Sequence, residues 1–230
     1  MTQQLTRTAS PVTCDPRTGV TRSLLGYGII AGPVYVGVSL AQALSREGFD
    51  LSRHPWSFLA NGDLGWIQIT NFVVAGLMVI ACAVGLGRAL AGGRGATWAP
   101  RLVGMYGVSL IGAGIFRADP AMGFPVGTPE GPGAVSLSGT LHFACGAVGF
   151  LCVIVTCFVI GRRFAVAGRT GWALYSRLTG GLFLAAFAAI ATSAGAPWAN
   201  LVFVSGVVII WAWLSALSLH LYRHITPQHA

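Results

Sequence analysis

The chain has 230 residues, of which 54% are hydrophobic and only 9% are charged, and its mean hydropathy is +0.71. This balance is typical of membrane proteins and excludes an ordinary soluble domain. The net charge of +8 at pH 7 comes from arginines that flank apolar segments and form no separate basic patch. We therefore expect membrane lipids as partners and no nucleic acid.

Apolar runs of about 20 residues, the length that crosses a bilayer as a helix, recur along the chain. They are Leu24–Leu44, Gly65–Leu86, Leu102–Phe116, Val135–Ile160 and Leu178–Leu219. The third run is short, but Arg101 and Arg117 at its ends can extend toward the headgroups. The last run is too long for one span and is interrupted at Ala194–Asn200, so it reads as two helices.

The sequence therefore predicts an all-α, polytopic membrane helix bundle with six transmembrane helices. Residues 1–20 are polar and are predicted to form a flexible cytoplasmic tail. The transmembrane domain is predicted to cover residues 21–222, and residues 223–230 to form a second cytoplasmic tail. We expect the first span to be retained and not cleaved as a signal peptide, because its polar leader is over twenty residues long.

All fourteen basic residues are arginine. If the N-terminus is cytoplasmic, eleven of them fall on the cytoplasmic side, and only Arg46, Arg53 and Arg117 fall outside. By the positive-inside rule, both termini are predicted to be cytoplasmic in a multi-pass protein of the cell membrane.

Two long loops are predicted on the outer side. The first loop carries Phe49, Trp56, Phe58 and Trp66, and we expect it to lie on the membrane surface as a short amphipathic segment. In the second loop, eight of the fourteen residues from Pro120 to Gly133 are Gly or Pro, which predicts consecutive turns.

Polar residues near the outer ends of two spans suggest a site. Gln68 and Asn71 are spaced i and i+3, so they share a helix face. His142 shares a face with small residues, such as Gly139 and Gly146, and is therefore expected to point into the bundle.

These residues predict a polar pocket at the outer leaflet, with the second loop folded over it. If the protein is an enzyme, the acid and base candidates are Asp119, His142 and Asp63. The candidates for ligand binding are Gln68, Asn71, Arg117 and His54. The simpler interpretation, because no spacing here matches a known catalytic motif, is that these groups only bond one another and hold the helices together. No H-x-x-x-H or H-E-x-x-H motif and no nucleotide fingerprint occurs, so we expect no metal and no cofactor.

Three functions are compatible with such a pocket. The preferred hypothesis is a membrane protein without enzymatic activity that binds a lipid-like ligand or a membrane partner there. The alternative is a membrane-embedded enzyme that acts on a lipid or an isoprenoid, and the third is a transporter of small solutes. The sequence does not predict an oligomeric state.

Three segments carry a family resemblance. They are "GFDLSRHPWSFLANGDLGWIQITNFVVAGL", "GIFRADPAMGFPVGTPEGPG" and "GTLHFACGAVGF", and together they resemble bacterial integral membrane proteins of the domain of unknown function family 998. The resemblance covers roughly Gly32 to Trp172. It implies a multi-helix protein of the bacterial cytoplasmic membrane, with Asp119, Pro120 and His142 at matching positions. It implies no particular reaction.

Overall fold

The computed structural model describes residues 16–193 and 195–225, and within these ranges the regular structure is helical. This described part of the chain contains six α-helices and one 3₁₀ helix, η1. Their bounds are α1 Pro16–Ser45, η1 Trp56–Ala60, α2 Gly65–Ala89, α3 Trp98–Ile115, α4 Leu137–Val166, α5 Thr170–Thr192 and α6 Pro197–His224.

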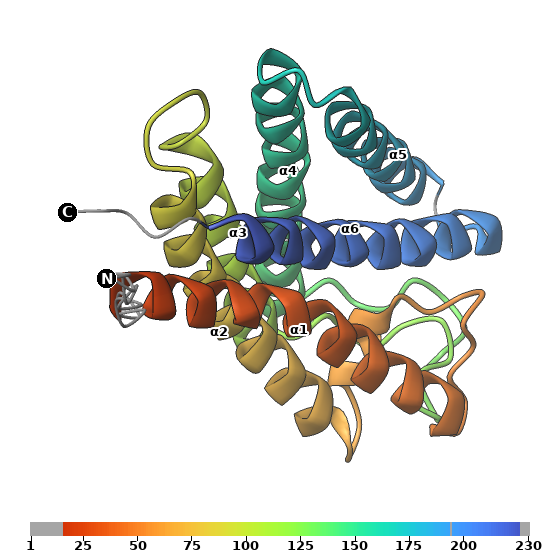
Figure 1. The fold of residues 1–230 in the computed structure, drawn as a ribbon. Helices are drawn as coiled ribbons and strands as arrows, with labels where there is room; N and C mark the ends of the chain where they lie inside the picture. Colours follow the sequence, from red (N-terminus) through yellow and green to blue (C-terminus); the bar gives the residue numbers. More distant parts are fainter. Residues whose placement is uncertain (1–15, 194, 226–230) are drawn as a thin grey trace, which may run out of the picture.

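The six α-helices form a closed ring in chain order. Each packs against its neighbours in the sequence, and α1 packs against α6 to close the ring (Figure 1). The start of α1 and the end of α6 lie together, at what we call the termini end. The opposite end carries two long loops, residues 46–64 and 116–136, which we call the cap. Five of the helices are long and apolar enough to span a membrane; the 18-residue α3 is not among them.

A glycine lies at each of the six helix contacts around the ring. The contacts and their glycines are α1–α2 with Gly85, α2–α3 with Gly76 and Gly107, α3–α4 with Gly149, α4–α5 with Gly161 and Gly180, α5–α6 with Gly206, and α6–α1 with Gly32. A Cβ atom added at Gly107 would lie 2.7 Å from the carbonyl oxygen of Gly76. Small residues thus let the helix backbones approach closely, which is the usual basis of helix packing in membranes.

Large side chains fill the interior of the ring toward the termini end. Trp211 of α6 stacks on Tyr35 of α1, with ring centroids 5.0 Å apart. Trp213 is fully buried, and its Nε1 donates a hydrogen bond to Ser176 Oγ at 3.1 Å. The outward faces of the helices carry many exposed Leu, Val and Ile side chains, as expected where lipid replaces water.

The helix ends follow local sequence signals. The last apolar run is divided as predicted, because α5 ends at Thr192 and α6 begins at Pro197. At the other end of the chain, α1 already begins at Pro16, inside the segment that we predicted to be a flexible tail. The rest of that predicted tail, residues 1–15, and the end of the second one, residues 226–230, lie outside the described residues.

The two cap loops differ in how well they were predicted. The glycine- and proline-rich loop consists of turns and bends, as predicted. The prediction that the aromatic residues of the first loop lie on the membrane surface is wrong for Trp56 and Phe58, which are only 5% and 6% exposed. Aromatic side chains in a loop indicate contact with an apolar environment, which can be the lipid interface or the protein interior. For Trp56 and Phe58 it is the protein interior.

The glycine contacts predict opposite effects for two adjacent residues of α5. A Cβ at Gly180 would lie 2.9 Å from the Cβ of Cys157 on α4, whereas one at Gly181 would meet nothing within 4 Å. Both substitutions to alanine gain up to about 1 kcal/mol of helix propensity. At Gly180 alone, the added methyl group also overpacks the contact with Cys157, which costs about 1–3 kcal/mol. We expect Gly180→Ala to lower the melting temperature in detergent and Gly181→Ala to leave it equal or higher. A Gly180→Ala variant as stable as Gly181→Ala would contradict the close α4–α5 contact.

Candidate functional site

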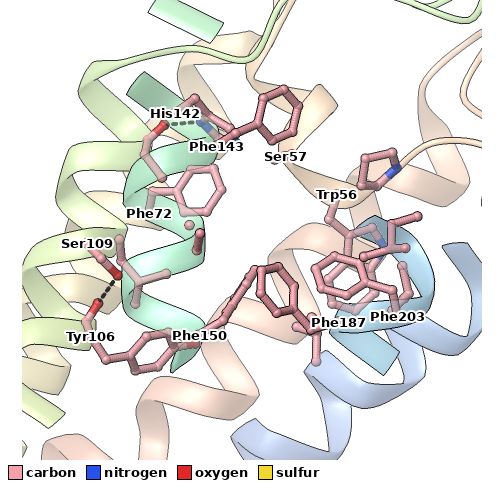
Figure 2. A pocket seen from close by; sticks show the side chains of 18 of the residues that line it. Trp56, Ser57, Phe72, Tyr106, Ser109, His142, Phe143, Phe150, Phe187 and Phe203 are labelled. Atoms are coloured by element: carbon pink, nitrogen blue, oxygen red, sulfur yellow. Dashed lines mark hydrogen bonds between the residues drawn. The ribbon is translucent and has the colours of Figure 1, made fainter. Parts of the chain in front are cut away.

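A cavity of about 330 Å³ lies inside the ring, in the half next to the cap. All six α-helices contribute to its wall, and Pro55, Trp56 and Ser57 of the cap also line it. Figure 2 shows the labelled side chains arranged around this space. Its volume lies at the lower end of the range of about 300–1,000 Å³ that is usual for small-molecule sites.

Aromatic rings dominate the wall of the cavity. The lining aromatic residues are Tyr35, Trp56, Phe72, Tyr106, Phe143, Phe150, Phe187 and Phe203. Phe150 of α4 makes edge contacts with Phe187 of α5 and Phe203 of α6, with ring centroids 5.5 Å apart in both cases. These rings are too large to let α4 and α5 close against each other at this level, so they border an open space.

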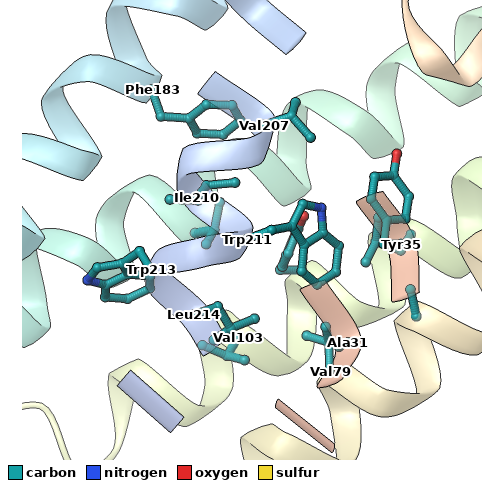
Figure 3. Close-up of a cluster of buried hydrophobic side chains, with 14 of the residues drawn as sticks. Ala31, Tyr35, Val79, Val103, Phe183, Val207, Ile210, Trp211, Trp213 and Leu214 are labelled. Atoms are coloured by element: carbon teal, nitrogen blue, oxygen red, sulfur yellow. The ribbon is translucent and has the colours of Figure 1, made fainter. Parts of the chain in front are cut away.

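The floor of the cavity is the buried core (Figure 3). Tyr35 and Tyr106 line the cavity, and both pack on Trp211, with centroids 5.0 Å and 5.6 Å from its ring. Trp211 itself is 1% exposed. The tightly packed interior below it separates the cavity from the termini end.

The cavity opens sideways between α4 and α5. These helices diverge from the turn that joins them at the termini end (Figure 1), and toward the cap both contribute lining residues. On the α4 side Phe143 lines the cavity although it is 58% exposed. On the α5 side the lining residue Ala191 is also exposed. This opening, which we call the lateral mouth, therefore faces outward from the ring between two apolar helices.

The wall of the cavity is mostly apolar. None of the described residues that line it is an aspartate, glutamate, lysine or arginine. His142 lines it and is 5% exposed. Its Nδ1 lies 3.0 Å from the carbonyl oxygen of Ala113 and 2.8 Å from that of Phe116. Because carbonyl oxygens only accept, Nδ1 carries the proton and donates. Nε2 is then left as an acceptor in the neutral ring, without a hydrogen-bond partner among the described residues.

Besides His142, the wall carries the polar side chains of Tyr35, Ser57, Tyr106, Ser109 and Trp56, and the last two differ in how they are satisfied. Ser109 Oγ donates to the carbonyl oxygen of Tyr106 at 2.7 Å. The indole Nε1 of Trp56 is buried and has no hydrogen-bond partner within the described part of the chain. A buried donor without a partner is uncommon in native proteins and calls for an explanation.

The 3₁₀ helix η1 forms the roof of the cavity, and an arginine holds it in place. Arg46, just after α1, donates to the carbonyl oxygen of Leu59 at 2.6 Å and to that of Asn61 at 2.7 Å. Its guanidinium also lies 5.0 Å from the centroid of the Phe124 ring in the second cap loop. Arg46 thus ties η1 to α1 and to the other loop.

His54 and an ion pair also join the two cap loops. His54 is buried; its Nδ1 accepts from the backbone N–H of Asp50 at 2.9 Å, so Nε2 carries the proton and donates to the carbonyl oxygen of Met122 at 2.8 Å. Arg53 and Glu130 form a more exposed ion pair at 2.7 Å, which contributes little in water. Both ring nitrogens of His54 are therefore used within the cap.

Asp119 and Arg117 follow the end of α3, lie beside the start of α4, and are not among the residues that line the cavity. The Asp119 carboxylate accepts from Ser136 Oγ at 2.5 Å and from the Ser136 backbone N–H at 2.9 Å. These bonds lower the pKa of the Asp119 carboxyl group below its usual value. Ser136 in turn caps α4 by accepting from the N–H of Gly139. The side chain of Arg117 is exposed.

Gln68 and Asn71 take part in a buried polar network between α1 and α2. Gln42 Nε2 donates to Gln68 Oε1 at 2.9 Å, and Asn71 Nδ2 donates to Ser39 Oγ at 3.2 Å and to the carbonyl oxygen of Tyr35 at 3.1 Å. These bonds join the two helices at the level of the cavity. Asp63 lies on the exposed surface of the cap.

The structure thus distributes the predicted site residues over three places. His142 lines the cavity, Gln68 and Asn71 bond to α1, and Asp63, Arg117, Asp119 and His54 belong to the cap or its border. Sequence reasoning missed the aromatic wall. A signal existed in the i, i+7 spacing of Phe143 and Phe150 on one helix face, but lipid-facing positions are equally apolar. Among the described residues, no three His, Cys, Asp or Glu side chains lie close enough to share a metal ion.

Five membrane-length apolar helices in a ring whose outer face is apolar define a multi-pass membrane protein. The family model described as "Protein of unknown function (DUF998)" matches residues 29–220. The chain therefore belongs to this family, and the resemblance of the three sequence segments is confirmed. No curated protein and no solved structure matches the chain.

Proposed function

We propose that this protein binds a lipid-like molecule in the cavity and exchanges it with the membrane through the lateral mouth. The observation that carries the proposal is an aromatic-lined cavity without charged side chains that opens between two lipid-length helices. A lipid-like ligand that enters from the bilayer stays in apolar surroundings there, and the aromatic rings provide large, rigid contact surfaces for its packing.

Lipid binding accounts for the site better than acid–base catalysis does. An acid–base mechanism needs a proton donor and an acceptor within hydrogen-bond reach of the substrate. Of the three candidates His142, Asp63 and Asp119, only His142 lines the cavity. The two carboxylates lie in the cap, where Asp119 bonds Ser136. The cavity wall therefore offers a binding surface with a single imidazole.

The proposal includes an orientation in a bacterial cytoplasmic membrane. With both termini cytoplasmic, the cap and the cavity face outward and α3 crosses as the sixth span. The α3 helix is about 27 Å long at 1.5 Å per residue, close to the hydrocarbon thickness of about 30 Å. Its place in the ring between α2 and α4 and the arginines at the termini end support this orientation.

Reporter fusions on the two sides of α3 test the orientation. Alkaline phosphatase fused after Gly127, in the cap, is expected to be active because it reaches the outer side. The same enzyme fused after Gly95, in the α2–α3 turn, is expected to be inactive. Equal activities would show that α3 does not cross, and exchanged activities would show the opposite orientation.

Filling the cavity tests lipid binding. A Cβ at Gly146 meets only the Phe150 ring, at 3.9 Å, so a leucine there projects into the cavity; Gly181 is an exposed α5 glycine with nothing within 4 Å. We expect Gly146→Leu to lower the lipid that co-purifies per protein at least about tenfold, since overlap with a ligand costs more than 1.4 kcal/mol. Gly181→Leu serves as the matched control and is expected to retain the wild-type amount. Lipid extraction and mass spectrometry measure both, and equal retention in the two variants would contradict the proposal.

A further inference from the structure

We infer that the ligand of the cavity is an uncharged lipid that carries a hydroxyl oxygen, and that Nε2 of His142 is the atom that recognises this hydroxyl. The inference rests on the proposed function, because it names the class of ligand for the same cavity. It is carried by the charge of the wall and by the fixed orientation of the His142 ring.

The wall excludes a charged headgroup. None of the described residues lining the cavity is a lysine, arginine, aspartate or glutamate. The lateral mouth is bordered by apolar residues, including Phe143, Ala147, Ile190 and Ala191, which offer no partner to a phosphate or an ammonium group. Burying an unpaired charge in such surroundings is very costly. A ligand that enters this space completely is therefore uncharged.

The fixed ring of His142 favours a ligand oxygen over pure hydrocarbon. Two backbone carbonyls of the α3 C-terminus hold Nδ1 at 3.0 Å and 2.8 Å. These contacts set both the orientation and the tautomer of the ring, and Nε2 remains an acceptor. A hydrocarbon ligand would cover this acceptor without replacing the hydrogen bond that it makes with water, whereas a hydroxyl group donates to it.

Trp56 lines the cavity with its ring and not with its N–H. The indole Nε1 is fully buried, so a ligand in the cavity does not reach this donor. Figure 2 shows Trp56 and His142 on different walls, and one hydroxyl group does not bond both. The wall that carries His142 therefore favours an oxygen-bearing ligand, whose hydroxyl donates to Nε2.

Three probes with the same chain length separate these contributions. Oleyl alcohol, 1-octadecene and oleate each have eighteen carbons and one double bond, which is at mid-chain in oleyl alcohol and oleate and at the chain end in 1-octadecene. They carry a hydroxyl, no polar group and a carboxylate, respectively. Binding to the purified full-length protein is measured by native mass spectrometry in detergent. We expect oleyl alcohol to bind about three- to tenfold more tightly than 1-octadecene, the value of one net hydrogen bond. Oleate at a pH where it is ionised is expected to bind more weakly than either.

Two conservative variants assign the preference to atoms. In His142→Asn the amide Nδ2 can replace the Nδ1 donor toward Ala113 and Phe116, while the remaining acceptor, Oδ1, lies closer to the backbone than Nε2 does. We expect this variant to bind 1-octadecene as the wild type does and to lose the preference for oleyl alcohol. Trp56→Phe keeps an aromatic ring and removes only the Nε1 donor, which a ligand in the cavity does not reach; it serves as the matched control and is expected to keep the preference for oleyl alcohol. A melting temperature for each variant shows that it is folded.

The outcomes distinguish this inference from the function on which it rests. If the wild type binds oleyl alcohol and 1-octadecene equally, or oleate most tightly, the hydroxyl assignment is overturned while lipid binding stands. If His142→Asn keeps the full preference, Nε2 is not the recognising atom. If none of the probes binds, or Gly146→Leu binds them as the wild type does, the cavity is not the lipid site and both proposals fail.

Discussion

The close approach of helix backbones at glycine is the constraint on which this structure depends. Without water between helices, packing and a few hydrogen bonds hold a membrane bundle together. Here a glycine lies at each of the six contacts of the ring. At the α2–α3 contact, two glycines face each other so closely that a Cβ on either would lie 2.7 Å from the carbonyl oxygen of the other. The ring closes because no side chain stands between its helices at these points.

The cavity lies where the close packing of helix backbones ends. Toward the termini end, Gly161 and Gly180 let α4 and α5 touch. Toward the cap, Phe150 and Phe187 take their place, and rings with centroids 5.5 Å apart separate the same two helices. The roof of the cavity does not come from the six α-helices; it is η1, which Arg46 holds in place over the cavity. One pair of helices thus provides both the closed part of the ring and its lateral mouth.

Much of the fold could be predicted from the sequence, and much of the site could not. Apolar run lengths located the six α-helices of the described residues, and the interruption at Ala194–Asn200 divided the last run, because these features depend on local composition. His142 was correctly placed inside the bundle, since its face carries Gly139 and Gly149. The partners of Gln68 and Asp119 were not predictable: Ser39 and Ser136 are common polar residues, and only the packing of α1 on α2 and of the cap on α4 selects them.

The cavity illustrates a second limit of sequence reasoning in membrane proteins. In a soluble protein, an aromatic stripe marks the buried face of a helix, because the other face is polar. In this chain Phe143 and Phe150 stand on a helix that is apolar on all sides, so their pattern does not distinguish lipid, protein and cavity. The same ambiguity explains why Trp56 and Phe58 were assigned to the membrane surface although they are buried in the cap.

The most direct test of the central claim is an electron cryomicroscopy map of the protein in nanodiscs made with its native lipids. If lipid enters through the lateral mouth, the map is expected to show elongated density inside the ring. This density continues between α4 and α5, beside Phe143 and Ala191. A map in which α4 and α5 close together up to the cap, with no density inside the ring, would contradict it.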